Sequence, residues 1–389
     1  MSKILIITNH SYMLYRFRLE LIQALMQDHE VVLSMPFVGH EQDFQAMGLK
    51  CIDTAVDRRG INPKTDLKLF GFYRKLLKSE RPDLVITYSI KPNVYAGIAC
   101  SLAGIPYCAN VQGLGTAFQR KGLAQFVTLL YKAAFRKVRT VFFENEANAA
   151  EFRRRGIIPA ERETLLNGAG INLEAYPFVP YPGCGAGQSD TGVSDGACAA
   201  NRSEAELQKG ASESAKVHFL YLGRIMKEKG MDELFEAAKR LHGEQVPFVL
   251  DLVGFFEDEY KERVEELQKL GIAVFHGFQQ EPRPYYAAAD CVVLPSYHEG
   301  MSNVLLEAAA TGRPVITSRI HGCMETVVEG ESGLLCEVKD AQSLYQAMKA
   351  FVELPVEKRA AMGTRGRKHM EENFEKSKVV EATIRALRL

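Results

Sequence analysis

The chain has 389 residues, of which 47% are hydrophobic and 25% are charged, a composition typical of soluble globular proteins and unlike that of disordered or fibrous ones. Its length exceeds what one hydrophobic core usually supports, so we expect two domains. Lys+Arg and Asp+Glu both total 48, so no overall field attracts nucleic acid. Residues 1–180 hold 23 Lys+Arg and 16 Asp+Glu, whereas residues 181–389 hold 25 and 32. The basic first half suits an anionic membrane surface or a phosphate-bearing partner, and equally an ordinary solvated surface.

The eight cysteines are scattered, with no C-x-x-C pair and no spacing typical of zinc ligands. We therefore expect a reduced, cytoplasmic compartment. The first ten residues, MSKILIITNH, have too short an apolar run for a signal peptide, and no stretch reaches the roughly 18 apolar residues of a membrane span. The sequence predicts a protein that does not cross a bilayer.

Short apolar runs alternate with helical patterns along the first half of the chain. The runs that we expect to form strands are 3–9, 30–36, 83–89, 105–111 and 140–145. Continuous apolar runs are typical of strands buried on both faces, so they predict a parallel sheet covered by helices. One such helix is expected at YRFRLELIQALMQ, where four apolar residues recur at helical spacing: Phe17, Leu21, Ile22 and Leu25.

The alternation stops near Pro177. Residues 181–215 are rich in Gly, Ala and Ser, so we assign residues 178–215 to a linker or a disordered excursion. A second series then begins, with strands expected at 217–223, 247–254, 273–278, 291–296 and 314–318. The pattern predicts an α/β fold of two doubly wound domains, residues 1–177 and 216–389, with a last helix that can cross back to the first domain.

The stretch HEGMSNVLLEAAATGRPVI, residues 298–316, carries the clearest sign of a binding site. It follows a predicted strand, so the helix expected from about Ser302 starts at the carboxyl edge of the sheet. Its free N–H groups and positive dipole end suit a phosphate, and Gly300 allows close approach of the backbone. Glu299 and Glu307 can accept hydrogen bonds from sugar hydroxyls, which together indicates a sugar nucleotide. The alternative is that Glu299 caps the turn and Glu307 is solvated.

A second cluster, YLGRIMKEKG at residues 221–230, supports the same ligand. Gly223 ends a predicted strand, Arg224 follows it directly, and Lys229 lies five residues further on. Both cations are expected over the carboxyl edge of the second sheet, where an Arg fork and a Lys point charge suit a diphosphate. Lys227, and Lys229 taken alone, are equally compatible with an ordinary surface.

The ordered combination of these motifs resembles the nucleotide-sugar-binding domain of retaining family 4 glycosyltransferases of the GT-B fold. The resemblance runs through most of residues 217–335 and includes GRIMKEKG, the two glutamates with seven residues between them, AAATGRPVITS and HGCMETVVEGESGLL. The first half resembles bacterial transferases that extend undecaprenyl-diphosphate-linked glycans, in the N-acetylgalactosaminyl- and galactosyltransferase branch, through HSYMLYRFR, TYSIKPNVYAGIA, VQGLGTAF and FFENEANAAEF. The resemblance implies two Rossmann-like domains that face a central cleft, the first binding the acceptor and the second the nucleotide sugar.

The resemblance also implies roles for single residues. Arg224 and Lys229 would bind the donor diphosphate and Glu299 the transferred sugar, all three as catalytic groups. Glu307 would bind the ribose hydroxyls. The other donor-binding residues implied are Gly223, Gly300, Met301, Ser302, Asn303 and Val304. Candidates in the cleft of the first domain are Asn9, His10, Arg16, Lys91, Gln112 and Gly113. Many relatives have a histidine where this chain has Gln112, so no general base is assigned.

We thus expect a retaining glycosyltransferase that moves a hexose or N-acetylhexosamine from a nucleotide sugar, UDP-linked by the resemblance, to a polyprenyl-diphosphate-linked saccharide in bacterial surface polysaccharide or glycoprotein glycan assembly. The sequence has no Asp-x-Asp pair, so we expect neither a metal nor another cofactor. Two alternatives stay open: a nucleotide-sugar epimerase of the same fold, and a nucleotide-sugar-binding module without turnover.

Residues 119–139 contain a pattern typical of a helix at a membrane interface. The apolar residues that can form its stripe are Phe126, Leu129, Leu130, Ala133 and Ala134, and the basic residues beside them are Lys121, Lys132, Arg136 and Lys137. Three arginines at 153–155 add positive charge. A helix packed on the core with a basic outer face explains the pattern equally well. A lipid-linked acceptor would bring the protein to the inner face of the cytoplasmic membrane.

Overall fold

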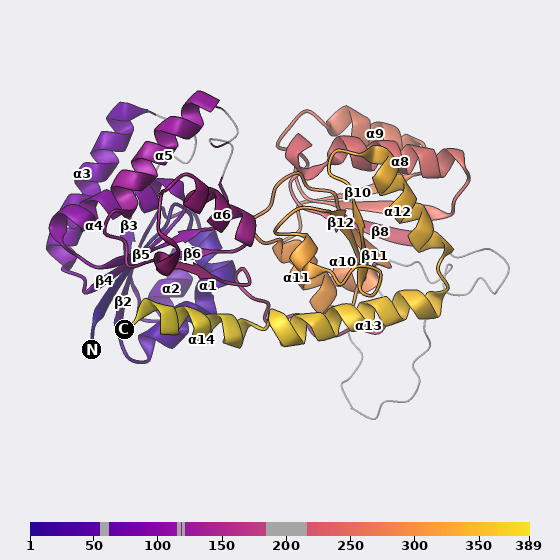
Figure 1. Cartoon of the computed structure of the whole chain (residues 1–389). Helices are drawn as coiled ribbons and strands as arrows, with labels where there is room; N and C mark the ends of the chain where they lie inside the picture. The colour runs from indigo at the N-terminus through magenta and orange to yellow at the C-terminus, as the bar shows by residue number, and fades with distance from the viewer. Residues whose placement is uncertain (55–61, 115–117, 119–120, 184–215) are drawn as a thin grey trace. The chain divides into compact units, whose positions relative to one another are not determined.

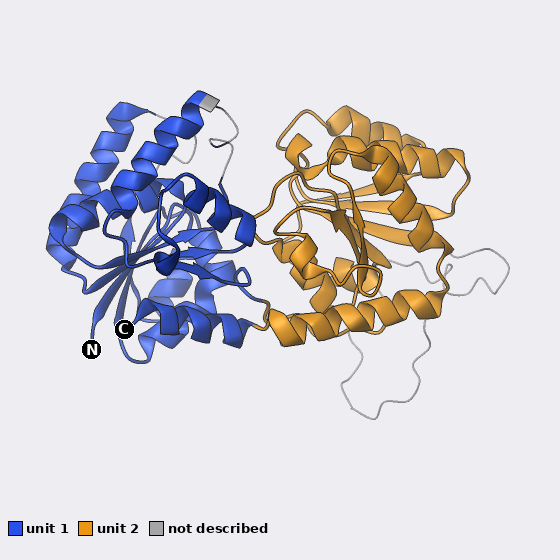
Figure 2. Ribbon diagram, viewed as in Figure 1, with its two compact units in different colours: residues 1–170, 376–389 blue, residues 171–375 orange. Residues whose placement is uncertain are grey.

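The computed structural model describes residues 1–54, 62–114, 118, 121–183 and 216–389. They fall into two compact units (Figure 2): unit 1 comprises residues 1–170 and 376–389, and unit 2 comprises residues 171–375. Each unit is an α/β domain built on one parallel sheet. The predicted fold class, two parallel-sheet α/β domains, is therefore confirmed.

The sheet of unit 1 has the strand order β3-β2-β1-β4-β5-β6-β7. The bounds are β1 Lys3–Ile7, β2 Glu30–Met35, β3 Lys50–Asp53, β4 Leu84–Tyr88, β5 Tyr107–Val111, β6 Thr140–Phe143 and β7 Glu163–Leu165. All five expected strands are present. The edge strands β3 and β7 were not expected, because KCID and ETL are short and mix polar with apolar residues.

Helices cover both faces of this sheet (Figure 1). One layer contains α1 Ser11–Met26, α2 Glu41–Ala46 and α14 Lys376–Leu387, and the other contains α3 Pro63–Glu80, the π-helical turn η1 Pro92–Ala96, α4 Gly97–Ala103, α5 Lys121–Phe135 and α6 Glu146–Arg154. The strand period of two separates their cores. Ile4 and Ile6 of β1 pack with the layer of α1, whereas Leu5 and Ile7 pack with the layer of α3.

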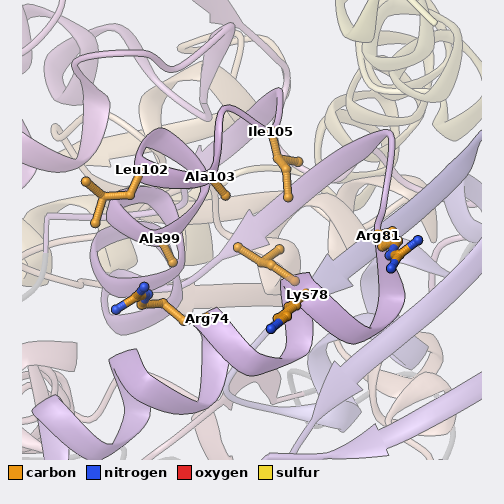
Figure 3. Close-up of a pocket in the computed structure, with 8 residues that line it drawn as sticks. Arg74, Lys78, Arg81, Ala99, Leu102, Ala103 and Ile105 are labelled. Atoms are coloured by element: carbon orange, nitrogen blue, oxygen red, sulfur yellow. The ribbon is translucent and has the colours of Figure 1, made fainter.

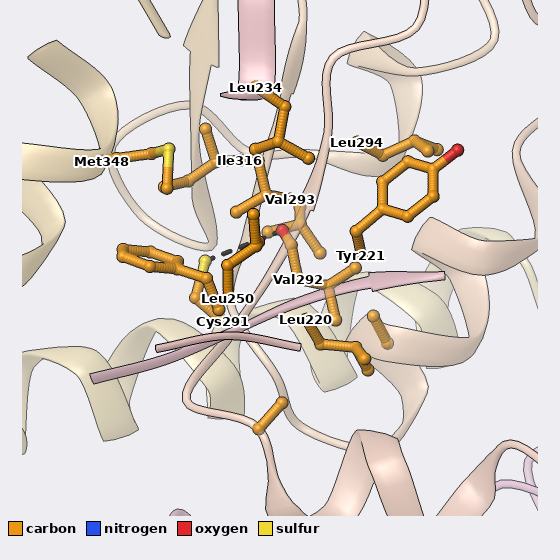
Figure 4. Packing of buried hydrophobic residues seen from close by; sticks show 14 of the residues in the cluster. Leu220, Tyr221, Leu234, Leu250, Cys291, Val292, Val293, Leu294, Ile316 and Met348 are labelled. Carbon is orange, nitrogen blue, oxygen red and sulfur yellow. Dashed lines mark hydrogen bonds between the residues drawn. The ribbon is translucent and has the colours of Figure 1, made fainter. Parts of the chain in front are cut away.

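The sheet of unit 2 has the strand order β10-β9-β8-β11-β12-β13. The bounds are β8 Val217–Leu222, β9 Phe248–Val253, β10 Ala273–Gly277, β11 Cys291–Leu294, β12 Val315–Ser318 and β13 Gly333–Cys336. The five expected strands are present, and the edge strand β13 is an addition. Apolar side chains of the central strands pack with Leu234 of α8 and Met348 of α12 (Figure 4).

The helices of unit 2 are α8 Met231–Gly243, α9 Lys261–Lys269, α10 Arg283–Ala288, α11 Asn303–Ala310, α12 Ala341–Glu353 and α13 Val356–Asn373, with the 3-10 turns η4 Lys227–Lys229 and η5 Met324–Thr326. α8 packs against α12, and α11 packs against α13. α11 is the helix expected from the sequence, with Ser302 as its N-cap and Thr311 as its C-cap.

The boundaries of the units differ from those expected. Unit 2 begins at Ile171 and not at residue 216. The fully buried guanidinium of Arg313 donates hydrogen bonds to the carbonyls of Val179 (3.0 Å) and Pro180 (3.1 Å), and a side chain at Gly312 would collide with the ring of Phe178. Residues 178–183 are thus anchored in unit 2 rather than forming a linker, and residues 184–215 lie outside the described residues. The last helix, α14, belongs to unit 1.

α5 exposes only part of the apolar stripe that its sequence indicates. Ala134 is buried, whereas Phe126 and Leu129 are 48% and 65% exposed. The side chains that the helix buries share only Ala134 with the predicted stripe; they are Ala124, Val127, Thr128, Tyr131, Ala134 and Phe135. The three arginines at 153–155 are neutralised by glutamates within unit 1: Arg153 pairs with Glu146 and Glu163, and Arg154 and Arg155 both pair with Glu151. The positive charge that these arginines add is therefore balanced locally by three glutamates.

Candidate active site

The loop after β8 brings the first predicted cation to the carboxyl edge of the sheet of unit 2. Gly223 has a φ of +151°, and a side chain at Gly254 would lie 1.8 Å from its carbonyl oxygen, so the ends of β8 and β9 approach as only glycine permits. The carbonyl of Arg224 accepts a hydrogen bond from the Tyr221 hydroxyl (2.5 Å). The Arg224 guanidinium is about half exposed, at 48%, and pairs with Glu257 (2.7 Å).

The turn η4 holds the second predicted cation against the loop after β11. Gly230 follows the turn with a φ of +72°, and a Cβ there would lie 2.1 Å from the carbonyl oxygen of Pro295. This packing places Lys229 beside Glu299, with which it forms a largely buried ion pair. The Ser296 hydroxyl donates a second hydrogen bond to the same carboxylate oxygen of Glu299 (2.8 Å).

The pKa values of two buried side chains, Tyr221 and Cys323, are shifted by the charged residues of the site. Burial, followed by the negative charge of Glu299, raises the pKa of the Tyr221 hydroxyl well above its ordinary value, and Arg224 opposes this shift. Burial and Glu299 likewise raise the pKa of the Cys323 thiol, and Lys229 opposes it. Glu299 therefore acts on both side chains, whereas Arg224 acts on Tyr221 and Lys229 acts on Cys323.

The amino end of α11 starts at the same edge. The N-cap Ser302 makes no side-chain hydrogen bond to the first turn, and that turn contains no acidic residue. The Ser302 N–H donates to the carbonyl of Gly322 (2.9 Å), and a side chain at Gly322 would lie 2.3 Å from the carbonyl oxygen of Gly300. The remaining predicted residues of this segment are buried or half-buried: Met301, Asn303 and Val304. Amide groups at such a helix start suit an anion.

Glu307 lies in the second turn of α11 and is only 7% exposed, so the alternative that it is solvated is wrong. The hydroxyl of Tyr286 in α10 donates a hydrogen bond to its Oε2 (2.9 Å). Tyr286 is itself fully buried, and its carbonyl accepts a hydrogen bond from Nε of Arg313 (2.9 Å). The carboxylate is therefore held in one orientation by a buried chain of hydrogen bonds.

The contacts of the site join the four principal residues only in part. Lys229 and Glu299 meet directly, whereas Arg224 pairs with Glu257 and Glu307 bonds to Tyr286. The sequence did not indicate Ser296, Glu257 or Tyr286 as members of the site. Glu257 and Tyr286 are separated from their partners by 33 and 21 residues, and a tyrosine in PYYAAAD has the spacing of an ordinary core residue.

The candidates in unit 1 gather at the carboxyl edge of its sheet. Asn9 follows β1, and its Oδ1 accepts a hydrogen bond from Ser89 after the neighbouring strand β4 (2.7 Å). His10 is the N-cap of α1. The other candidates near this edge are half-buried: Arg16 in α1, and Gln112 and Gly113 after β5. Lys91 forms an ion pair with the buried Asp66 of α3 (2.9 Å), which gives it a structural partner within the unit.

Comparison with known families accounts for both units. The family model of glycosyl transferases group 1 matches residues 202–369, and that of glycosyl transferase 4-like proteins matches residues 3–145. The chain belongs to the group 1 glycosyltransferases. This glycosyltransferase has the GT-B fold, because its two parallel-sheet units match solved GT-B glycosyltransferases over the whole chain.

Two curated relatives of the glycosyltransferase have names that specify a lipid-linked saccharide. It is 28% identical over 347 residues to N,N'-diacetylbacillosaminyl-diphospho-undecaprenol alpha-1,3-N-acetylgalactosaminyltransferase of Campylobacter jejuni, with 87% of this chain and 86% of that one covered. It is 27% identical over 303 residues to UDP-Gal:alpha-D-GlcNAc-diphosphoundecaprenol alpha-1,3-galactosyltransferase of Escherichia coli, with 75% and 71% covered. Among solved structures, Anabaena HepE in complex with UDP and glucose has a TM-score of 0.76 at 18% identity, with 100% of both chains covered.

Proposed function

We propose that the glycosyltransferase moves a hexose or N-acetylhexosamine from a UDP-linked donor to a polyprenyl-diphosphate-linked saccharide, with retention of configuration, in the assembly of a bacterial surface polysaccharide or glycoprotein glycan. The two curated relatives support the acceptor class, since the names of both specify a saccharide on diphospho-undecaprenol. The donor is supported by the name of the Escherichia coli relative and by a structural neighbour in complex with UDP and glucose.

The observation that carries the proposal is the ion pair of Lys229 and Glu299 beside the start of α11. A cation that binds the donor diphosphate and an acid that binds the transferred sugar have to lie on either side of the bond that breaks. Their direct contact supports a position of that bond next to both side chains. Glu307, held by Tyr286, would then accept hydrogen bonds from the ribose hydroxyls.

Electrostatic stabilisation of the leaving group is the main chemical task of these residues. As the bond between the sugar C1 and the diphosphate oxygen breaks, positive charge develops on the sugar and negative charge on the departing diphosphate. Arg224, Lys229 and the amides from Gly300 to Val304 stabilise the diphosphate. The acceptor oxygen attacks C1 from the side of the leaving group, and its proton passes to the departing phosphate, so the configuration is retained.

These cations and the helix start supply the positive charge that a metal ion provides in other transferases. We therefore propose transfer without a metal or another cofactor. Activity that persists after dialysis against a chelator would support this, and activity that only added Mg²⁺ or Mn²⁺ restores would contradict it.

A lipid-linked acceptor requires the enzyme to work at a membrane, and we propose a cytoplasmic protein on the inner face of the cell membrane. Within the part of the chain that the structure describes, no helix has the length and hydropathy needed to span a bilayer. Contact with the membrane would then be made at the surface of the protein.

Incubation of the purified protein with radiolabelled UDP-sugars, with and without an undecaprenyl-diphosphate-linked saccharide, tests the proposal. Product formation only with the acceptor supports glycosyl transfer. Conversion of the donor without the acceptor would instead indicate an epimerase, and binding without conversion would indicate a module that only binds nucleotide sugars. An anomeric assignment of the new bond by NMR decides whether the configuration of the donor is retained.

A further inference from the structure

A pocket of about 360 Å³ lies between α3 and α4 of unit 1 (Figure 3). One wall is formed by Arg74, Leu77 and Lys78 of α3 together with Arg81, the C-cap of that helix, and the other largely by Ala99, Leu102 and Ala103 of α4. Arg74 and Lys78 are four residues apart and so share one face of α3, and Arg81 lines the pocket from the end of the helix. The pocket thus combines a positive wall with an apolar wall.

The charge of this pocket is not balanced by its surroundings. None of the three cations forms an ion pair in the described part of the chain. α3 contains two acidic residues, and both are buried and engaged elsewhere: Asp66 pairs with Lys91, and Glu80 pairs with Lys3 and Lys50. α4 and α5 contain no acidic residue at all. An anion that carries several oxygen atoms would find three donors here without competition.

The helical layer that contains the pocket also exposes apolar side chains to solvent. Leu102 of α4 is 70% exposed, and on the neighbouring α5 Leu129 is 65% and Phe126 is 48% exposed. α5 packs against α4, and Lys137, just after α5, donates a hydrogen bond from Nζ to the carbonyl of Ser101 (3.2 Å). Three large apolar side chains and several cations therefore occupy one helical layer, an arrangement typical of surfaces that enter the headgroup region of a membrane.

The pocket lies at the opposite edge of the sheet from the substrate residues. Arg81 ends α3 shortly before β4 begins, and Pro106 leads from the pocket residue Ile105 into β5, so the pocket is at the amino ends of these strands. Asn9 and Gln112 follow the carboxyl ends of β1 and β5. A ligand in the pocket is consequently not the saccharide that these residues would bind.

We propose that the outer face of α3, α4 and α5 docks on an anionic phospholipid surface, with the phosphate of one lipid headgroup in the pocket between Arg74, Lys78 and Arg81. Leu102, Phe126 and Leu129 enter the boundary between headgroups and acyl chains. The inference rests on the proposed function in one respect, since a polyprenyl-linked acceptor has to be met at a membrane. Docking does not depend on the transfer chemistry, so the two can fail separately.

Flotation of the full-length protein with vesicles tests the inference. The probes are vesicles of phosphatidylcholine alone and vesicles of phosphatidylcholine and phosphatidylglycerol in equal parts. We expect binding to the anionic vesicles only. The variant with Arg74→Gln, Lys78→Gln and Arg81→Gln should bind them on the order of 100-fold more weakly, since each cation near an anionic surface contributes a factor of about five. The matched control removes three exposed cations of unit 2, by Lys261→Gln, Lys269→Gln and Lys358→Gln, and should bind as the wild type does.

Two further measurements separate docking from catalysis and from diffuse electrostatics. Transfer to a short-chain, water-soluble acceptor should be unchanged in the α3 variant, and its loss would mean that the pocket belongs to the substrate site and would overturn the proposal. Leu129→Gln should weaken vesicle binding about tenfold, because the apolar contact that Leu129 makes with the lipid in the docked state is lost. Equal binding of the α3 variant and the control variant, or no binding of the wild type to anionic vesicles, would also overturn it. Vesicle binding without glycosyl transfer would leave the inference standing and reject the proposed function.

Discussion

Glu307 is a charged residue with almost no access to solvent, and its environment explains how this is possible. A buried carboxylate is costly unless hydrogen bonds replace its hydration. The Tyr286 hydroxyl supplies one such bond, and the fully buried Arg313 fixes the backbone of Tyr286 from the other side. Thr311 closes the helix by bonding to the carbonyl of Glu307, so the residue is fixed at both its backbone and its side chain.

Tyr286→Phe should therefore weaken donor binding while the transfer step stays intact. A hydrogen bond to a charged group is worth about 1.5–3 kcal/mol, so we expect the KM for the nucleotide sugar to rise by on the order of 10- to 100-fold with little change in kcat. Steady-state kinetics at varied donor concentration measure the split. Tyr285→Phe, which removes the hydroxyl of the neighbouring residue, serves as the control.

A double variant sharpens this test. In the Glu307→Ala background, which should itself weaken donor binding, Tyr286→Phe should have no further effect on KM, because the group that it positions is gone. Additive effects of the two substitutions would show that Tyr286 acts by another route.

Lys229→Ala should slow the transfer step itself. If the ammonium stabilises the departing diphosphate, its loss costs about 2.7–4 kcal/mol in the barrier, a fall in kcat of about 10²–10³-fold. Lys227→Ala is a matched control in the same turn, because Lys227 is exposed and lies two residues away. Rapid-quench measurement of a single turnover separates the chemistry from product release. Equal rates for the two variants would place the diphosphate elsewhere.

At the scale of the element, the turn η4 and the start of α8 are fixed by close backbone packing. Besides the approach of Gly230 to Pro295, the N–H of Tyr297 donates to the carbonyl of Glu228 (2.8 Å). The loops after β8 and β11 are thus joined to each other at the point where Lys229 meets Glu299. The position of the cation follows from this backbone contact more than from its own side-chain bonds.

Gly230→Ala should therefore affect both stability and the site. The left-handed φ and the collision with the Pro295 carbonyl should lower the free energy of unfolding by about 1–3 kcal/mol, measured by urea denaturation of the intact protein. Donor affinity should fall as well, since Lys229 is displaced. Gly243→Ala at the other end of α8 is the control, because nothing lies within 4 Å of a Cβ there. An unchanged midpoint for Gly230→Ala would show that the two loops separate easily.

At the scale of the whole molecule, the chain returns to unit 1 after completing unit 2. α14 packs against α1, the fully buried Leu387 and the nearly buried Val379 join the core that contains Ile4 and Ile6, and Arg139 donates a hydrogen bond to the carbonyl of Leu387 (2.9 Å). Unit 1 is therefore complete only when the last twelve residues of helix, 376–387, have been added.

Leu387→Ala should destabilise unit 1 and spare unit 2. Truncation of a buried leucine costs about 2–5 kcal/mol, so the thermal transition of unit 1 should move to lower temperature in differential scanning calorimetry. A UDP-sugar at 100 times its dissociation constant should stabilise unit 2 by about 2.7 kcal/mol in both wild type and variant. Leu389→Ala, at a residue 46% exposed, is the control and should have little effect. A loss of UDP-sugar stabilisation in Leu387→Ala would indicate that the two units do not unfold separately.

The sequence predicted the central strands of both sheets and the loops that follow them at the carboxyl edge. A strand that helices cover on both faces is mostly apolar along its length. Each central strand can therefore be recognised in the sequence as a run of apolar residues, from KILII in β1 to VITS in β12. The edge strands β3, β7 and β13 do not have to meet this requirement, and the sequence did not predict them. Gly223, Arg224, Glu299 and the start of α11 were predicted to lie at one edge for the related reason that loops after parallel strands share an edge.

Which of these groups are partners depends on tertiary packing. The contact of Lys229 with Glu299 depends on how two loops 70 residues apart pack, and the bond from Tyr286 to Glu307 depends on how α10 lies against α11. Local periodicity contains no information about either contact, because a side chain buried against a carboxylate and one buried in the core leave the same helical spacing. The anchoring of residues 178–183 by Arg313 and the return of α14 to unit 1 are likewise long-range packing, and no short segment of the chain encodes them.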